Sequence, residues 1–121
     1  MNANQLKLDL EQFYGTENYW RLNPFTDMCA TDGTKYFCEK AQAFWLFDEI
    51  ALTVPKIKNE HFIVVKIKAD TKENNYGTAI INYEDGNYNQ ITSKYIEYTD
   101  LPHGEWKFYV IDNVVMLPSE Y

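Results

Sequence analysis

Hydrophobic and polar positions near the start of the chain follow a helical spacing. Leu6, Leu10 and Phe13 recur at i, i+4 and i+7, and the residues between them are mostly polar. Asn4 is a residue type favoured at a helix start, and Gly15 is typical of a helix end. The pattern therefore predicts one amphipathic helix between these two residues.

The following segment, residues 14–30, is rich in turn-forming residues and predicts irregular structure that aromatic side chains hold against the core. A longer helix is then predicted from Lys35 to Val54, with Asp32 as its N-cap and Pro55 as its end. Apolar residues surround part of this segment almost completely, which is typical of a buried helix. Gln42 marks a point where it can break into two.

Beyond Glu60 the spacing of apolar residues changes to two, which is typical of β-strands. The predicted strands are residues 61–69, 76–84, 88–98, 105–111 and 114–118. Asp85-Gly86-Asn87 favours a tight hairpin turn because Gly and Asn tolerate positive φ. We therefore predict a single domain, residues 1–121, with an α+β fold in which the N-terminal helices pack on one face of a four- to five-stranded antiparallel β-meander.

Charge narrows the classes of partner. Eighteen acidic and eleven basic residues give a formal net charge of −7, which disfavours direct binding to nucleic acid or to an anionic membrane surface. An acidic domain suits a protein partner with a basic surface. The chain has two cysteines, expected to be free thiols, no apolar run of about 20 residues and no pattern typical of a signal peptide, so we expect a cytoplasmic protein.

Candidate catalytic chemistry is sparse. His61 and His103 lack the spacing of a zinc or iron site, and neither a glycine-rich phosphate loop nor a nucleophile motif is present. We therefore predict no catalytic residue, metal or cofactor. Two alternatives stay open: a small enzyme with an acid–base pair drawn from Asp32, Asp48 or His61, and a structural or homo-oligomeric accessory protein.

Tyrosine and asparagine are concentrated in two neighbouring strands. The tyrosines are Tyr76, Tyr83, Tyr88, Tyr95 and Tyr98. Because side chains alternate along a strand, all five cannot point inward, and exposed tyrosines are frequent in protein interfaces. The alternative interpretation is a set of cross-strand aromatic pairs that stabilise the sheet. The expected partner contacts are Tyr83, Glu84, Asp85 and Tyr88 on one hairpin, with Glu97, Tyr98 and Asp100 nearby.

Several segments carry a resemblance to a known family. They are FYGTENYW at 13–20, TDGTKYF at 31–37, AFWLFDEIA at 43–51, DGN at 85–87, YTDLP at 98–102 and LPSEY at 117–121. In this order they resemble a family of uncharacterised small bacterial proteins that is associated with phage and mobile elements. The resemblance implies no catalytic residue. It implies a context in which small acidic proteins often inhibit host defence, as anti-CRISPR proteins do.

These observations together favour a non-enzymatic acidic protein-binding domain. The most specific form of this hypothesis is an anti-CRISPR-like inhibitor that occupies the basic nucleic-acid-binding surface of a host defence nuclease, because RNA-guided effectors hold nucleic acid in a positively charged channel.

Overall fold

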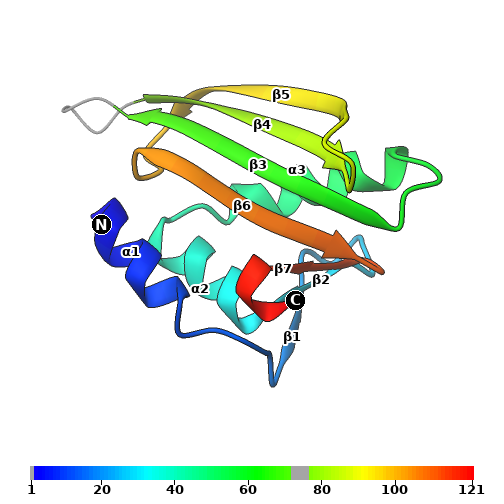
Figure 1. Cartoon of the computed structure of the whole chain (residues 1–121), viewed down its shortest axis with the longest axis horizontal. Coiled ribbons are helices and arrows are strands. Elements are labelled where there is room, and N and C mark those ends of the chain that lie inside the picture. The colour runs from blue at the N-terminus through cyan, green and yellow to red at the C-terminus, as the bar shows by residue number, and fades with distance from the viewer. Residues whose placement is uncertain (1, 72–76) are drawn as a thin grey trace.

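The computed structural model describes residues 2–71 and 77–121, and within them the fold is α+β (Figure 1). The helices are α1 (Ala3–Leu10), α2 (Asp32–Lys40) and α3 (Trp45–Thr53), with short 3₁₀ turns η1 (Val54–Lys56) and η2 (Pro118–Glu120). The strands are β1 (Tyr19–Arg21), β2 (Cys29–Thr31), β3 (Phe62–Thr71), β4 (Gly77–Asp85), β5 (Gln90–Thr99), β6 (Gly104–Ile111) and β7 (Val114–Met116). Tyr76, where the second strand was predicted to start, lies outside the described residues.

The helices begin earlier than the sequence pattern predicts. Asn2, and not Asn4, caps α1 by accepting from the backbone N–H of Asn4 at 2.7 Å. Thr31, and not Asp32, caps α2 by accepting from the backbone N–H of Thr34. The predicted break of the long helix at Gln42 is confirmed, because this residue has φ +53° between α2 and α3.

The sheet differs from the predicted meander of four to five antiparallel strands. Within the residues that the structure describes, its seven strands follow the order β1-β2-β7-β6-β3-β4-β5, and β2 pairs with β7 in parallel. The two extra strands, β1 and β2, lie in the segment that was predicted to be irregular. The strand β6 does not pair with β5, which precedes it in the chain. It pairs with β3, so that β3 and β4 lie between β6 and β5 in the sheet. The chain therefore crosses the end of two strands between Thr99 and Gly104.

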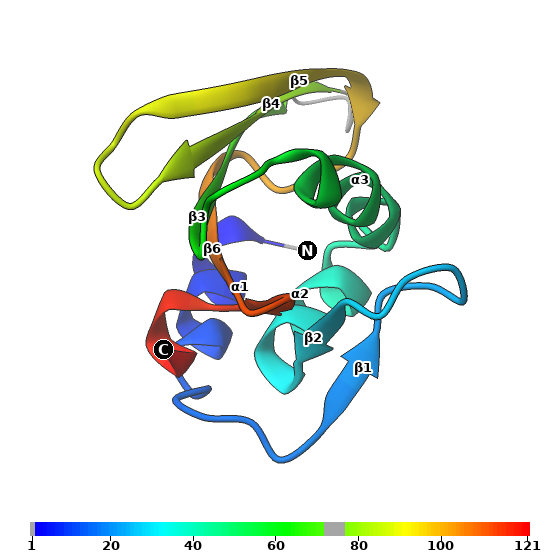
Figure 2. The same ribbon diagram turned by 90° about the vertical axis from the view of Figure 1, so that its right-hand side faces the viewer.

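The core lies between the concave face of the sheet and the helices. Figure 2 shows the sheet bending around this space, with α3 on its inner side. Phe37 of α2 is fully buried and its ring lies 5.0 Å from Phe108 and 5.2 Å from Trp106, both on β6. The helix α1 packs on α2, since Tyr36 donates to Asp9 at 2.8 Å. The prediction that helices cover one face of the sheet agrees with these contacts.

Candidate functional site

One expected contact residue, Tyr83, lies in the protein core. Its side chain is 0% exposed, and its hydroxyl donates to Glu49 Oε2 of α3 at 2.8 Å. On β4 it shares the inner face with Ala79 and Ile81, which are also buried. Burial, and then the hydrogen bond to Glu49, raise the pKa of Tyr83 far above its ordinary value. Tyr83 is therefore not the exposed contact residue that was expected, because its ring is buried and Glu49 accepts from its hydroxyl.

Glu84 and Asp85 are both engaged inside the protein, Glu84 with a lysine of β3 and Asp85 within the hairpin. The Glu84 carboxylate lies 3.1 Å from Lys66 Nζ. Asp85 accepts from the backbone N–H groups of Asn87 and Asn89 and from the Asn89 side chain. The backbone bond from Asn89, then its side-chain bond, lower the pKa of Asp85. Asp85 therefore holds a turn where the sequence predicted one, but the positive φ of this turn falls on Tyr88 (+69°) and not on Gly86 or Asn87. Reversing the charge of Asp85 would disturb the hairpin as well as any binding surface.

The remaining expected contacts lie at two separate ends of β5. Tyr88 precedes the strand, and its ring lies 5.6 Å from Lys66 Nζ. Glu97, Tyr98 and Asp100 lie at or just beyond the other end. At about 3.3 Å per residue, the two ends are roughly 30 Å apart. The expectation that all of these residues lie near one another is therefore wrong.

The far end of β5 presents exposed aromatic and acidic side chains together. We define the β5 corner as Ile80 of β4 with Tyr95, Glu97, Tyr98 and Asp100. Ile80 stands opposite Tyr95 in the register, so both side chains project from the outer face of the sheet. Glu97 and Tyr98 lie at a register shift, between the pairs Ala79–Ile96 and Gly77–Thr99. Such a bulge makes the strand bend and re-aims its side chains.

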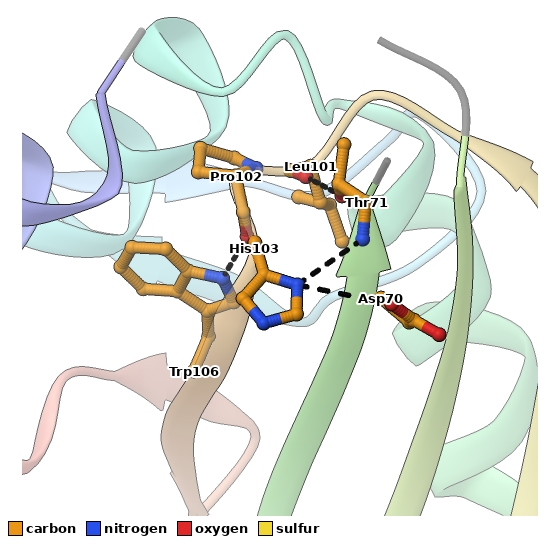
Figure 3. Close-up of polar contacts among 6 residues, drawn as sticks. All are labelled: Asp70, Thr71, Leu101, Pro102, His103 and Trp106. Carbon is orange, nitrogen blue, oxygen red and sulfur yellow. Dashed lines mark hydrogen bonds and ion pairs between the residues drawn. The ribbon is translucent and has the colours of Figure 1, made fainter. Parts of the chain in front are cut away.

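The connection after the β5 corner forms a polar depression against the end of β3 (Figure 3). The Thr71 hydroxyl donates to the Leu101 carbonyl, and the Thr71 N–H donates to His103 Nδ1 at 3.3 Å. Because Nδ1 accepts, the neutral ring carries its hydrogen on Nε2. Asp70 Oδ1 lies 3.9 Å from the same nitrogen. Trp106 donates to the Pro102 carbonyl at 2.9 Å and holds the buried side of this connection.

This depression has the open form of a surface feature. Its volume is about 640 Å³, and it is lined by Asn2, Ala3, Asn4, Thr71, Asp100, Pro102 and His103. His103 and Asp70 are both exposed, but the 3.9 Å between Nδ1 and Oδ1 is too long for a hydrogen bond, and Nδ1 already accepts from Thr71. Catalysis by this histidine would also need a nucleophile or a polarising group nearby, and the lining side chains that belong to residues 2–71 and 77–121 include neither a cysteine nor a lysine.

The residues of the enzyme alternative hold structural positions. Asp32 accepts from Trp20 Nε1 at 2.9 Å and from the N–H groups of Glu17 and Asn18, and the bond from Trp20, followed by that from Glu17, lowers the pKa of Asp32. A lowered pKa makes a carboxylate a weaker base. Asp48 accepts from Asn23. Across residues 2–71 and 77–121, no hydrogen bond or ion pair joins any two of Asp32, Asp48 and His61.

The cysteines and metal-binding residue types are also dispersed. Cys29 and Cys38 are free. Burial, with a smaller effect from Glu39, raises the pKa of the Cys38 thiol well above its ordinary value, so this thiol is a poor nucleophile. In the part of the chain that the structure describes, no group of three or more His, Cys, Asp and Glu is placed to hold a metal ion.

Sequence reasoning did not identify a second surface, a groove under the free edge of β5. Its volume is about 560 Å³. Side chains from α3, η1, the segment after η1, β4 and β5 line it, and three of them are Lys56, Lys58 and Lys94. One part of this groove could have been predicted from the sequence. The alternation along β5 places Lys94 on the inner face, between Thr92 and Ile96. The positions of Lys56 and Lys58 beside that strand depend on tertiary packing.

Comparison with known proteins identifies the family. A model described as a family of unknown function (DUF6876) matches residues 4–121. The chain belongs to this family. No curated protein and no solved structure matches the chain. The predicted resemblance to an uncharacterised family is therefore confirmed over nearly the whole length. Among the described helices, none is both long and apolar enough to cross a membrane.

Proposed function

We propose that this member of the DUF6876 family is a non-enzymatic protein-binding domain that docks through the β5 corner. The supporting observation is that the corner exposes large side chains: Ile80 is 43% exposed, Tyr95 59% and Tyr98 78%. Tyrosine offers rigid, amphipathic contact area and is frequent among the residues that dominate interface energies. Burying these rings in an interface would remove a substantial apolar area from water.

The charge of the corner favours a basic partner. Glu97 and Asp100 are exposed, and no ion pair engages either of them within the described residues. Asp70 of β3 is a third carboxylate near the corner. It stands opposite Thr78, and Thr78 lies beside the bulge that holds Glu97 and Tyr98. Carboxylates at the rim of an aromatic patch steer association with a positive surface. Arginine on the partner can also stack on exposed tyrosine rings.

A more specific form of the proposal concerns the partner's identity. We propose an inhibitor that occupies the basic nucleic-acid-binding surface of a host defence nuclease, in the manner of anti-CRISPR proteins. The acidic corner would then replace phosphate groups, and the tyrosines would supply contact area that nucleic acid does not. This form requires that the bound protein is a nuclease and that nucleic acid competes with the domain for it.

The test is affinity capture with matched variants, followed by measurement of the affinity for each recovered protein. Tyr95→Ala with Tyr98→Ala, and separately Glu97→Lys with Asp100→Lys, are expected to weaken binding roughly tenfold to a hundredfold. Tyr14→Ala and Glu17→Lys, which change exposed residues elsewhere, should leave it unchanged. Equal binding by all variants would refute the proposal, as would concentration-dependent self-association through the corner without a partner.

A further inference from the structure

The strand β5 ends the sheet and leaves one of its edges unpaired. The sheet order finishes with β5, whose only neighbour is β4 within the described residues. Register shifts interrupt the pairing near both ends of the strand, and the stretch Thr92–Ile96 is regular between them. An unpaired, regular edge presents backbone N–H and C=O groups that can accept an additional strand.

The groove described above runs beside this edge. Its apolar lining includes Leu52 of α3, Ile57 after η1 and Ile91 of β5. On the same side, Tyr83 and Thr53 donate to Glu49 Oε2 at 2.8 and 2.6 Å. These two hydroxyl groups partly satisfy the Glu49 carboxylate within the protein. The groove thus combines an open strand edge, apolar side chains and a fixed polar base.

The lysines of the groove differ from the other lysines of the protein. Those outside it, within residues 2–71 and 77–121, each lie in an ion pair or over an aromatic ring; they are Lys7, Lys35, Lys40, Lys66, Lys68 and Lys107. Lys56, Lys58 and Lys94 have neither kind of contact among the described residues. In a chain with net charge −7, the lysines that have no such contact among the described residues therefore line one groove.

We infer that this groove binds an extended, acidic segment of a partner protein, which adds to the sheet as a strand beside β5. The backbone of the segment would pair with the regular stretch of β5, and side chains on alternate positions would face the groove. There its carboxylates would meet Lys56, Lys58 and Lys94, and its apolar side chains would cover Leu52, Ile57 and Ile91. The groove lies on the inner side of β5, whereas the side chains Ile80 and Tyr95 of the β5 corner project from the outer face, and the ligand of the groove has the opposite charge.

Two features of the groove limit which segment fits. Glu49 and Glu60 also line it. Carboxylates of the ligand must therefore lie toward the lysines and away from these two glutamates. Lys94 is a charged residue on the inner face of an edge strand. Such a charge also discourages the edge strands of two copies of a protein from pairing with each other. If that were its only role, the groove would bind no peptide and Lys94→Gln would cause self-association.

Selection from a random library of short displayed peptides against the whole protein tests the inference. Enriched sequences should combine β-branched residues with Asp or Glu, and synthetic versions should bind in fluorescence anisotropy. Each of Lys56→Gln, Lys58→Gln and Lys94→Gln should weaken binding about threefold, and the triple variant about thirtyfold. The matched control is Lys68→Gln, which removes the same charge from the outer face and should change binding little.

Further measurements separate strand addition from loose electrostatic attraction. Methylating the backbone nitrogens of a selected peptide that face β5 should abolish binding. In NMR spectra of the protein, the chemical-shift changes on adding the peptide should concentrate in Thr92–Ile96. No enrichment, enrichment of basic peptides, or equal binding by the triple variant and the control would overturn the inference. So would a dimer formed through β5 without peptide. The corner variant Glu97→Lys with Asp100→Lys, which lies outside the pairing stretch Thr92–Ile96, should leave peptide binding unchanged, so this site and the proposed function can fail independently.

Discussion

Replacing Tyr83 by Phe tests whether this residue belongs to the core, as the structure places it, or to a binding surface. The change keeps the buried ring and its volume, and it removes the hydroxyl group that donates to Glu49 Oε2 at 2.8 Å. A hydrogen bond to a charged acceptor contributes about 1.5–3 kcal/mol, and Thr53 keeps its own bond to the same oxygen. We therefore expect the free energy of unfolding to fall by about 2 kcal/mol.

Urea denaturation followed by tryptophan fluorescence measures this change, and thermal denaturation gives an independent value. For a chain of this length, about 2 kcal/mol corresponds to a decrease of roughly 8 °C in the thermal midpoint. Tyr95→Phe is the matched control because Tyr95 is exposed, and it should behave like the wild type. Equal stability of the Tyr83→Phe variant and this control would refute the assignment of Tyr83 to a buried hydrogen bond.

The pH dependence of the same pair gives a second test. The folded protein raises the pKa of Tyr83 above its ordinary value of 10.0, chiefly through burial. The neutral hydroxyl therefore stabilises the fold fully below pH 10, and this contribution is lost as the pH rises above 10, where the unfolded chain releases the proton first. The stability advantage of the wild type over Tyr83→Phe should shrink by up to about 1.4 kcal/mol per pH unit there. A constant difference would contradict the burial.

Three further predictions concern the core and the chain ends. Phe37→Ala should cost about 3–5 kcal/mol in urea denaturation, because the ring fills the space between α2 and β6; a loss below 1 kcal/mol, by the same principle, would contradict that packing. Glu120→Ala should cost about 2–3 kcal/mol, since this carboxylate accepts from Thr31, Gly33 and Leu117 and faces the N-terminus of α2; Ser119→Ala is its control. Iodoacetamide should modify Cys29 and spare buried Cys38 until urea is added, as mass spectrometry can determine.

The periodicity of the sequence predicts most elements of the second half of the chain because it depends on local alternation. Residues 61–69 and 105–111 were predicted as strands, and apart from His61 they fall within β3 (Phe62–Thr71) and β6 (Gly104–Ile111). The order of the strands does not follow from alternation. It depends on the buried crossing at Leu101 and on the bond from Trp106 to the Pro102 carbonyl, which fix β6 beside β3. The three-residue strands β1 and β2 are too short to show a period.

Part of the candidate site was predictable and part was not. The position of Tyr83 could have been inferred, because alternation places it on the same face of β4 as Ala79 and Ile81. The exposure of Tyr98 depends on the bulge in β5, which the sequence does not mark. The role of Asp85 in its turn agrees with the predicted hairpin. The grouping of Lys56 and Lys58 with Lys94 depends on how α3 packs under the sheet, which local patterns do not specify.

Hydroxyl-radical footprinting of the tyrosine side chains, free and bound to the captured partner, tests the proposed docking surface most directly. If the β5 corner is the interface, the reactivity of Tyr95 and Tyr98 should fall on binding. Tyr88, about 30 Å away along the hairpin, and Tyr14, which is 84% exposed, should stay reactive. Unchanged reactivity of Tyr95 and Tyr98, with protection of Tyr14 or Tyr88 instead, would show that the partner binds elsewhere.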